Sequence, residues 1–148
     1  IFHVRGKGNN EFVIKPMNCP HHTQIFASRQ RSYRDLPLRY AEATTVYRDE
    51  QAGELLGLTR VRAITQDDGH VFCRTDQISE EVEAMISMAE EFYDKIDIGL
   101  RFRLSVRGEE ASQYLGDQSV WDLAEDSLRK ILANNNYFTF FVFRFAFS

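Results

Sequence analysis

The segments LRYAEATTVYR (residues 38–48) and RVRAITQDDGHVFC (residues 60–73) decide the fold, because both are rich in residues that favour extended backbone. They flank a partly acidic, glycine-containing loop, residues 49–57. Two extended segments joined by a loop predict a β-hairpin, and loops of this length often carry functional residues. The rest of the chain is therefore interpreted around this hairpin.

A second, shorter hairpin is predicted near the start of the chain. Residues 5–10 are rich in Gly and Asn, which tolerate the backbone of tight turns, and the strand that follows, residues 12–14, is stopped by Pro16. Further along, apolar residues alternate with polar ones over residues 100–107, which predicts a half-buried strand.

Three helices are predicted from composition, apolar spacing and capping residues. They run from His21 to Tyr33 with Pro20 in the first turn, from Ile78 to Tyr93 with Thr75 or Asp76 as N-cap, and from about Ser119 to the asparagines at 134–136 with Asp117 as N-cap. The apolar stripe of the last helix comprises Val120, Leu123, Ala124, Leu128, Ile131 and Leu132. Together these elements predict an α+β fold, with a mostly antiparallel sheet flanked by helices.

Length and composition bound the class of protein. The 148 residues, 43% hydrophobic and 27% charged, fit one globular domain, and we treat residues 1–148 as a single unit. No apolar run is long enough to cross a bilayer, and two cysteines cannot form a disulfide scaffold, so we expect a cytoplasmic protein without a membrane partner. The net charge of −4 disfavours non-specific nucleic-acid binding, although the first 62 residues, with ten Lys/Arg and six Asp/Glu, could hold phosphates.

Both ends of the chain are unusual. It begins with Ile, and six phenylalanines fall within its last eleven residues, at 138, 140, 141, 143, 145 and 147. We interpret residues 137–148 as an altered terminus, which would be a strand if folded and an aggregation hazard if exposed.

Three polar residues, Gln66, Asp68 and His70, share one face of the second long strand because side chains alternate along extended backbone. Apolar residues flank them, which favours a ligand-binding floor. An edge strand with a solvated face explains the pattern equally well. Asp67 and Asp68 point to opposite faces and are not an acid–base pair.

Five soft or borderline metal donors lie in two short clusters: Cys19, His21, His22, His70 and Cys73. Zinc needs three protein ligands at a catalytic site and four at a structural one. On a strand, His70 and Cys73 point to opposite faces, so we do not expect them to bind one ion. A buried cysteine and surface histidines are the alternative interpretation.

Three arginines bracket the loop of the long hairpin: Arg48, Arg60 and Arg62. The guanidinium groups of Arg48 and Arg60 could converge on a triphosphate. Surface ion pairs with Asp49, Glu50 and Glu54 are the alternative. The chain has no Walker-type or dinucleotide glycine motif, so side chains on the sheet would have to hold a nucleotide.

Three ordered motifs carry a family resemblance. They are KPMNCPHH (residues 15–22), SYRDLPLR (residues 32–39) and the block from Arg48 to Cys73 with its TQDDGHVFC end. In this order they resemble the threonyl-tRNA synthetase family of class II aminoacyl-tRNA synthetases, whose motif 2 hairpin the third block matches. The resemblance covers residues 12–135 and implies that the chain is part of a class II catalytic core.

The resemblance implies an amino-acid and zinc site. Cys19 and His70 match two zinc ligands of the family, whose third, a histidine, comes from further downstream than this chain reaches. Zinc there takes the amino and hydroxyl groups of threonine, which excludes valine. Met17, Gln66 and Asp68 match positions around the amino acid.

The resemblance also implies an ATP site with Mg²⁺. Arg48 matches the arginine that stabilises the α-phosphate, Glu50 the residue that binds the adenine amino group, and Arg60 a second phosphate-binding arginine. Ile64 stands where the family usually has a phenylalanine that stacks on adenine. Loss of that contact, worth roughly 1 kcal/mol, predicts weaker ATP binding.

The activity implied is ATP-dependent formation of threonyl-adenylate and transfer of threonine to the 3′ end of tRNA(Thr), by an enzyme that is a homodimer when intact. Motif 1, the motif 3 arginine, and the editing and anticodon-binding domains are not found in these 148 residues, so we expect a shortened form whose activity alone is doubtful. A non-catalytic synthetase-like module that binds ATP, zinc or tRNA is the alternative. A gene product without independent function is a third interpretation.

Overall fold

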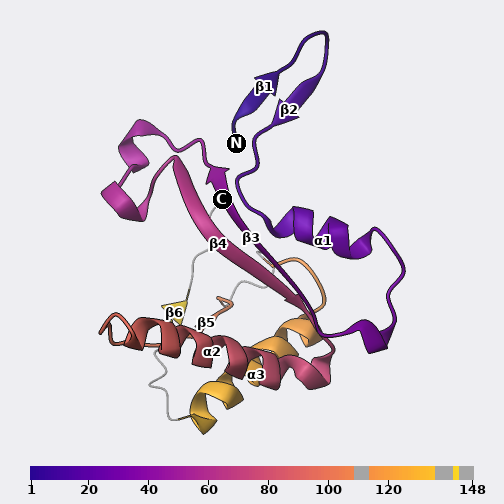
Figure 1. The fold of residues 1–148 in the computed structure, drawn as a ribbon, viewed down its shortest axis with the longest axis vertical. Helices are drawn as coiled ribbons and strands as arrows, with labels where there is room; N and C mark the ends of the chain where they lie inside the picture. The colour runs from indigo at the N-terminus through magenta and orange to yellow at the C-terminus, as the bar shows by residue number, and fades with distance from the viewer. Residues whose placement is uncertain (109–113, 136–141, 144–148) are drawn as a thin grey trace. The chain divides into compact units, whose positions relative to one another are not determined.

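The computed structural model describes residues 1–108, 114–135 and 142–143 (Figure 1). The chain divides into two compact units, Ile1–Phe72 and Cys73–Ser148, which are described separately. The predicted mixture of helices and antiparallel strands is confirmed. The prediction of one sheet is wrong: the described strands form three separate two-stranded sheets, two antiparallel and one parallel.

The first unit begins with the predicted short hairpin. Strands β1 (His3–Arg5) and β2 (Glu11–Val13) pair antiparallel, and the Gly6 amide donates to the Asn10 carbonyl across the turn at 3.0 Å. Gly8 has φ +84°, a left-handed conformation that glycine adopts without steric cost.

The long hairpin is confirmed and dominates the first unit (Figure 1). Strands β3 (Leu38–Tyr47) and β4 (Ala63–Phe72) pair antiparallel along their full ten residues, in a register that sets Leu38 opposite Phe72 and Tyr47 opposite Ala63. The connection between them contains two 3-10 turns, η2 (Ala52–Glu54) and η3 (Gly57–Thr59). The register decides which side chains share a face, and therefore the composition of the candidate site.

Helix α1 (Cys19–Ala27) is shorter than predicted. Pro20 does lie in its first turn, but the helix ends at Ala27, and Ser32 and Asp35 form a capping box around a new 3-10 turn, η1 (Tyr33–Asp35). The ring of Phe26 stacks on Phe72 with centroids 4.3 Å apart and planes 6° apart. This contact joins α1 to the end of β4.

The core of the second unit lies between two helices, α2 (Ile78–Asp94) and α3 (Gln118–Asn134). Its buried members are Ile86, Leu104, Ile131 and Leu132, with Val82, Phe102, Val106 and Leu128 packed around them. On α2, Val82 and Ile86 pack in this core, whereas Met85 is 47% exposed. The predicted apolar stripe of α3 holds only in its second half, since Val120 and Leu123 are 64% and 49% exposed.

The start of α2 differs from the prediction. Thr75 and Asp76 belong to a preceding 3-10 turn, η4 (Thr75–Gln77), and the N-cap is Gln77, which makes no capping hydrogen bond with its side chain. Asp76 instead accepts from the Arg74 guanidinium at 3.0 Å. The Asp76 carboxylate, which could have capped α2, is therefore engaged in an ion pair with Arg74.

The predicted strand at 100–107 is confirmed in its alternation of exposed and covered side chains, but not in its length. Only β5 (Ser105–Val106) pairs among the described residues, with β6 (Val142–Phe143), and the pairing is parallel. Pairing requires a partner strand, which the remaining residues of this segment lack within the described ranges. Apart from 142–143, the Phe-rich tail lies outside the described residues.

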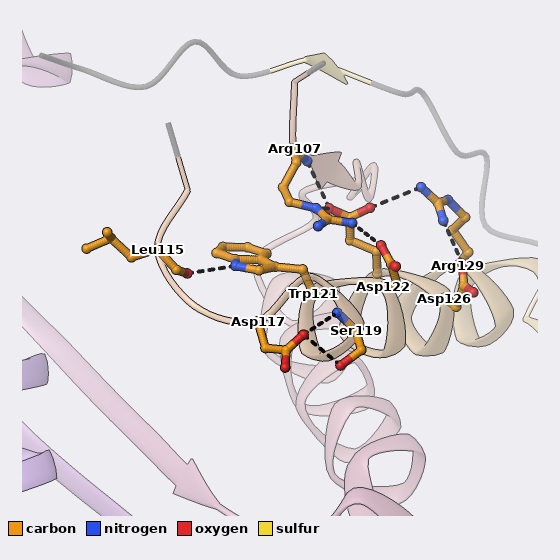
Figure 2. A network of polar contacts seen from close by, with 9 residues as sticks. Arg107, Leu115, Asp117, Ser119, Trp121, Asp122, Asp126 and Arg129 are labelled. Carbon is orange, nitrogen blue, oxygen red and sulfur yellow. Dashed lines mark hydrogen bonds and ion pairs between the residues drawn. The ribbon is translucent and has the colours of Figure 1, made fainter. Parts of the chain in front are cut away.

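Helix α3 carries an ion-pair network on its first turns (Figure 2). Asp117 is the predicted N-cap and accepts from the Ser119 amide at 3.0 Å. The buried carboxylate of Glu125 accepts from the backbone amide and the Nε of Arg107, at 3.0 and 2.9 Å. Arg107 also pairs with Asp122, while Arg129 bridges Glu125 and Asp126.

The network fixes the segment before α3 as well. The indole Nε1 of Trp121 donates to the Leu115 carbonyl at 2.9 Å, and the Arg107 guanidinium lies 5.7 Å from the Trp121 ring centroid (Figure 2).

None of the helices in the described part of the chain is long and apolar enough to cross a membrane.

Candidate functional site

One face of the β3–β4 hairpin carries the polar residues that the sequence pattern singled out. Gln66, Asp68 and His70 are half-buried on alternate positions of β4, so the predicted shared face is confirmed. Their partners across the ladder are Thr44, Glu42 and Tyr40, in that order. Side chains from the segment before and within α1 contact this face, which is therefore not a simple solvated strand surface.

Asn18, which sequence reasoning passed over, is the most buried polar residue of this face at 1% exposed. Its amide Nδ2 donates to Asp68 Oδ2 at 2.9 Å. This hydrogen bond lowers the pKa of Asp68; burial opposes it, and the nearby imidazoles of His70 and His22 add to the lowering. The buried Oδ1 of Asn18 has no hydrogen-bond partner among the described residues, so the site retains an unused acceptor.

Two carboxylates lie directly opposite each other on the hairpin. Glu42 pairs with Asp68 in the ladder, a like-charge arrangement that is destabilising unless cations compensate. Lys15 Nζ lies 3.4 Å from Glu42 Oε2, and His22 Nε2 lies 3.6 Å from Glu42 Oε1. The sequence could not reveal this pair, since it depends on register. The result is an anionic floor suited to an ammonium group or another cation.

A pair of histidines closes one end of this face. His22, only 4% exposed on α1, lies with its Nδ1 2.7 Å from Nδ1 of His70. The two rings are nearly perpendicular, at 81°, and His22 also contacts the Tyr40 ring. Of the two adjacent histidines in the chain, the structure brings His22 to the site and leaves His21 exposed.

The remaining metal donors are distributed unevenly. Cys19 is exposed at the first position of α1, whereas Cys73 follows β4 and burial raises the pKa of its thiol, which disfavours the thiolate that zinc needs. In residues 1–108, 114–135 and 142–143 no group of three or more His, Cys, Asp or Glu side chains could hold a metal ion. Cys19 and His70 have the donor types of zinc. Two ligands are fewer than a zinc site needs, so the described residues do not by themselves complete one.

The loop arginines are engaged with acidic residues and carbonyls. Arg60 donates twice to Glu50 Oε2, from Nε at 3.1 Å and from the terminal nitrogen at 2.9 Å, and lies 3.3 Å from Glu54. The hydrogen bond to Glu50 raises the pKa of Arg60. The ion-pair alternative is therefore the one observed for Arg60, and it involves Glu50, another predicted ATP-binding residue.

The other two arginines contact the backbone. Arg48, an exposed residue, donates from Nε to the Pro16 carbonyl at 3.4 Å, and Arg62 donates to the Glu50 carbonyl at 3.0 Å. Arg48 thus lies beside the segment that carries Met17, which is 46% exposed. Ile64 is 37% exposed and pairs across the ladder with the buried Val46, so it offers an apolar surface at the loop end of the hairpin.

Comparison with known proteins places this geometry in a family. Residues 2–144 match the tRNA synthetase class II core domain (G, H, P, S and T). The chain belongs to this family. Two relatives of the chain are threonine–tRNA ligases. The one from Deinococcus radiodurans is 52% identical to the chain over 118 residues. The one from Rhodopirellula baltica is 46% identical over 133 residues.

The matches cover most of this class II core chain but little of each relative. They include 78% and 89% of the chain and 18% of each ligase. Among solved structures, the RNA binding domain of threonyl-tRNA synthetase from Cryptosporidium parvum superposes with a TM-score of 0.80 at 34% identity, over 95% of this chain and 34% of that one. The identity to these ligases confirms the predicted resemblance to threonyl-tRNA synthetases. The structural match confirms the predicted α+β fold.

Removal of the Asn18 amide tests the electrostatics of this face. In Asn18→Ala the pKa of Asp68 should rise towards its ordinary value of 3.8. Because the folded-state pKa is lowered, the stabilisation is complete above the ordinary pKa and is lost as pH falls through the folded value. We expect the variant to lose about 1–2 kcal/mol at neutral pH and less at acidic pH.

NMR titration of the Asp68 carboxyl, with urea unfolding at two pH values, measures both effects. Asn9→Ala, at an exposed asparagine, is the control and should change neither. An Asp68 titration that is unchanged by Asn18→Ala would contradict the assignment.

Proposed function

We propose that this chain forms part of the catalytic core of a threonine–tRNA ligase, which joins threonine to ATP as an adenylate and transfers it to tRNA(Thr). The observation that carries the proposal is the 46–52% identity to threonine–tRNA ligases over a span that includes the polar face of the β3–β4 hairpin. Residues 1–148 would belong to one catalytic domain, and the intact protein would be a cytoplasmic homodimer.

The amino-acid end of the site is the anionic floor. Asp68, Gln66 and Met17 would surround threonine, whose ammonium group matches the negative charge of Asp68 and Glu42. The Asp68 carboxyl, whose pKa lies below its ordinary value, is ionised at neutral pH and can accept hydrogen bonds from the substrate. Cys19 and His70 would be two of the zinc ligands. When bound, zinc supplies a Lewis acid that favours a substrate with both an amino and a hydroxyl group.

The ATP end lies where the long hairpin meets its loop. Arg48 would bind the α-phosphate, Glu50 the adenine amino group and Arg60 a further phosphate, with Mg²⁺ accompanying ATP. Ile64 would cover one face of adenine by dispersion. Since Arg60 is held by Glu50 and Glu54, it must leave these ion pairs to bind a phosphate. The pair with Glu54 is exposed and costs little to break, whereas the pair with Glu50 is part-buried and costs more.

The chemistry needs charge stabilisation more than proton transfer. A carboxylate oxygen of threonine attacks the α-phosphorus, a new P–O bond forms, and pyrophosphate leaves. Negative charge develops on the α-phosphate oxygens, and the Arg48 guanidinium would stabilise it. In the second step a ribose hydroxyl of the terminal adenosine of tRNA attacks the carbonyl carbon, and AMP leaves.

Threonine-dependent ATP–pyrophosphate exchange, measured together with ATP and tRNA binding, tests this function. Exchange that requires threonine and is absent with valine supports the ligase. ATP or tRNA binding without exchange would instead favour the non-catalytic module. In the intact protein, that outcome, or the absence of both binding and exchange, overturns the proposed ligase function.

Zinc content tests the metal assignment separately. We expect His70→Ala to lower the zinc content of the purified intact protein, which would supply the third ligand, by at least about tenfold, since loss of one ligand removes a large part of the coordination energy. Cys73→Ser is the matched control at the nearby cysteine and should leave zinc unchanged. Zinc content that is unaffected by His70→Ala would contradict the assignment, whatever the activity.

A further inference from the structure

The contact between His22 and His70 determines which ring nitrogen of His70 is available to a ligand. Their Nδ1 atoms lie 2.7 Å apart, a hydrogen-bonding distance. When both imidazoles are neutral, such a contact is possible only if one Nδ1 carries a proton and the other accepts it. The direction of this hydrogen bond therefore decides the tautomer of both rings.

Glu42 indicates the direction. Its Oε1 is buried and has no hydrogen-bond partner within the described part of the chain, and His22 Nε2 lies 3.6 Å away. An N–H at His22 Nε2 would place a positive dipole against this carboxylate, whereas a lone pair there would repel it. The arrangement thus favours His22 with its proton on Nε2 and a lone pair on Nδ1.

We infer that His22 is a positioning residue that holds His70 in the Nδ1–H tautomer and so presents the Nε2 lone pair of His70 to its ligand. The chain of contacts runs from Glu42 through His22 to His70. It rests on the proposed function only in naming that ligand as the zinc of the amino-acid site. A metal-bound histidine commonly donates its second ring N–H to a fixed acceptor, and here the acceptor is another imidazole.

The geometry explains why a histidine is buried on α1. His22 is 4% exposed and contacts both Tyr40 and His70, so its ring cannot rotate freely. A phenylalanine could occupy much of the same space but could not accept the proton. An asparagine is smaller, yet its Oδ1 can occupy roughly the position of the histidine Nδ1 and accept from His70.

Long-range ¹H–¹⁵N correlation spectra of the metal-free chain, recorded where the imidazoles are neutral, test the inference. Isolated neutral histidine favours the Nε2–H tautomer, whereas we expect His70 to be mainly Nδ1–H. His22→Phe should shift the tautomer ratio of His70 by about tenfold towards Nε2–H, the loss of one hydrogen bond. His22→Asn should retain the Nδ1–H form, and His21→Asn, at the exposed neighbour, is the control.

This design separates the inference from the proposed function. The tautomer is measured without zinc, ATP or threonine, so an inactive chain still gives an answer. A His70 that is mainly Nε2–H in the unaltered chain, or a ratio that is the same in His22→Phe, overturns the inference. Circular dichroism and the other assigned resonances establish whether each variant is folded. If His22→Phe does not fold, the tautomer ratio of His70 in His22→Asn and in the unaltered chain still tests the inference.

Discussion

Replacement of Glu125 by alanine is expected to lower the free energy of unfolding of the second unit by about 3 kcal/mol. The Glu125 carboxylate is buried and accepts from the Arg107 backbone amide and guanidinium and from Arg129. Its removal leaves the Arg107 amide without this acceptor and removes the buried one of the carboxylates that pair with the Arg107 and Arg129 guanidinium groups. Loss of one member of a buried ion pair costs more than the pair contributes.

The neighbouring acid provides a matched control. Asp126 lies next to Glu125 on α3, pairs with Arg129 at 2.7 Å, and its side chain is 60% exposed. Asp126→Ala should change the free energy of unfolding by less than about 0.5 kcal/mol. Urea unfolding monitored by Trp121 fluorescence measures both variants. Equal effects of the two substitutions would show that the network does not depend on burial.

Glu125 also predicts a pH dependence. Burial raises the pKa of Glu125, but the hydrogen bonds from the Arg107 amide and guanidinium outweigh it, so the pKa lies below its ordinary value of 4.5. Its contribution to stability is therefore complete above that ordinary value and is lost as pH falls through the folded-state pKa. Glu125→Gln should flatten this acid limb of the stability curve.

Replacement of Arg48 by alanine is expected to lower kcat for threonine-dependent ATP–pyrophosphate exchange by about 10²–10³-fold, if the proposed ligase function holds. Arg48 is the exposed guanidinium beside the Met17 segment, and it would stabilise charge that develops on the α-phosphate only as the threonine carboxylate attacks. An interaction formed in the transition state lowers kcat as well as kcat/KM when it is lost.

Two further variants separate charge from geometry. Arg48→Lys keeps the charge but loses the planar fork, and should recover only part of the rate. Arg29→Ala removes an exposed positive charge that lies after α1 and should leave the exchange rate unchanged. Exchange by Arg48→Ala at the unaltered rate would remove Arg48 from the reaction, and a change only in KM for ATP would restrict it to ground-state binding.

Much of the local structure could be predicted because it depends on residues close together in the chain. The long hairpin follows from two extended segments around a loop, and Asp117 caps α3 because Ser119 lies two residues away. Predictions were wrong where a competing local interaction was overlooked: the Ser32–Asp35 capping box starts a new turn after α1, and the Arg74–Asp76 pair removes a cap from α2.

The sequence alone determined the family resemblance, the two hairpins and the face shared by Gln66, Asp68 and His70, because motifs and side-chain alternation are properties of neighbouring residues. Only the tertiary structure decided their partners. Asn18 meets Asp68 from 50 positions away, His22 meets His70 from 48, and Glu42 faces Asp68 through strand register. These contacts depend on how α1 packs on the hairpin, as in the stack of Phe26 on Phe72, and packing between distant segments leaves no periodic signal in the sequence.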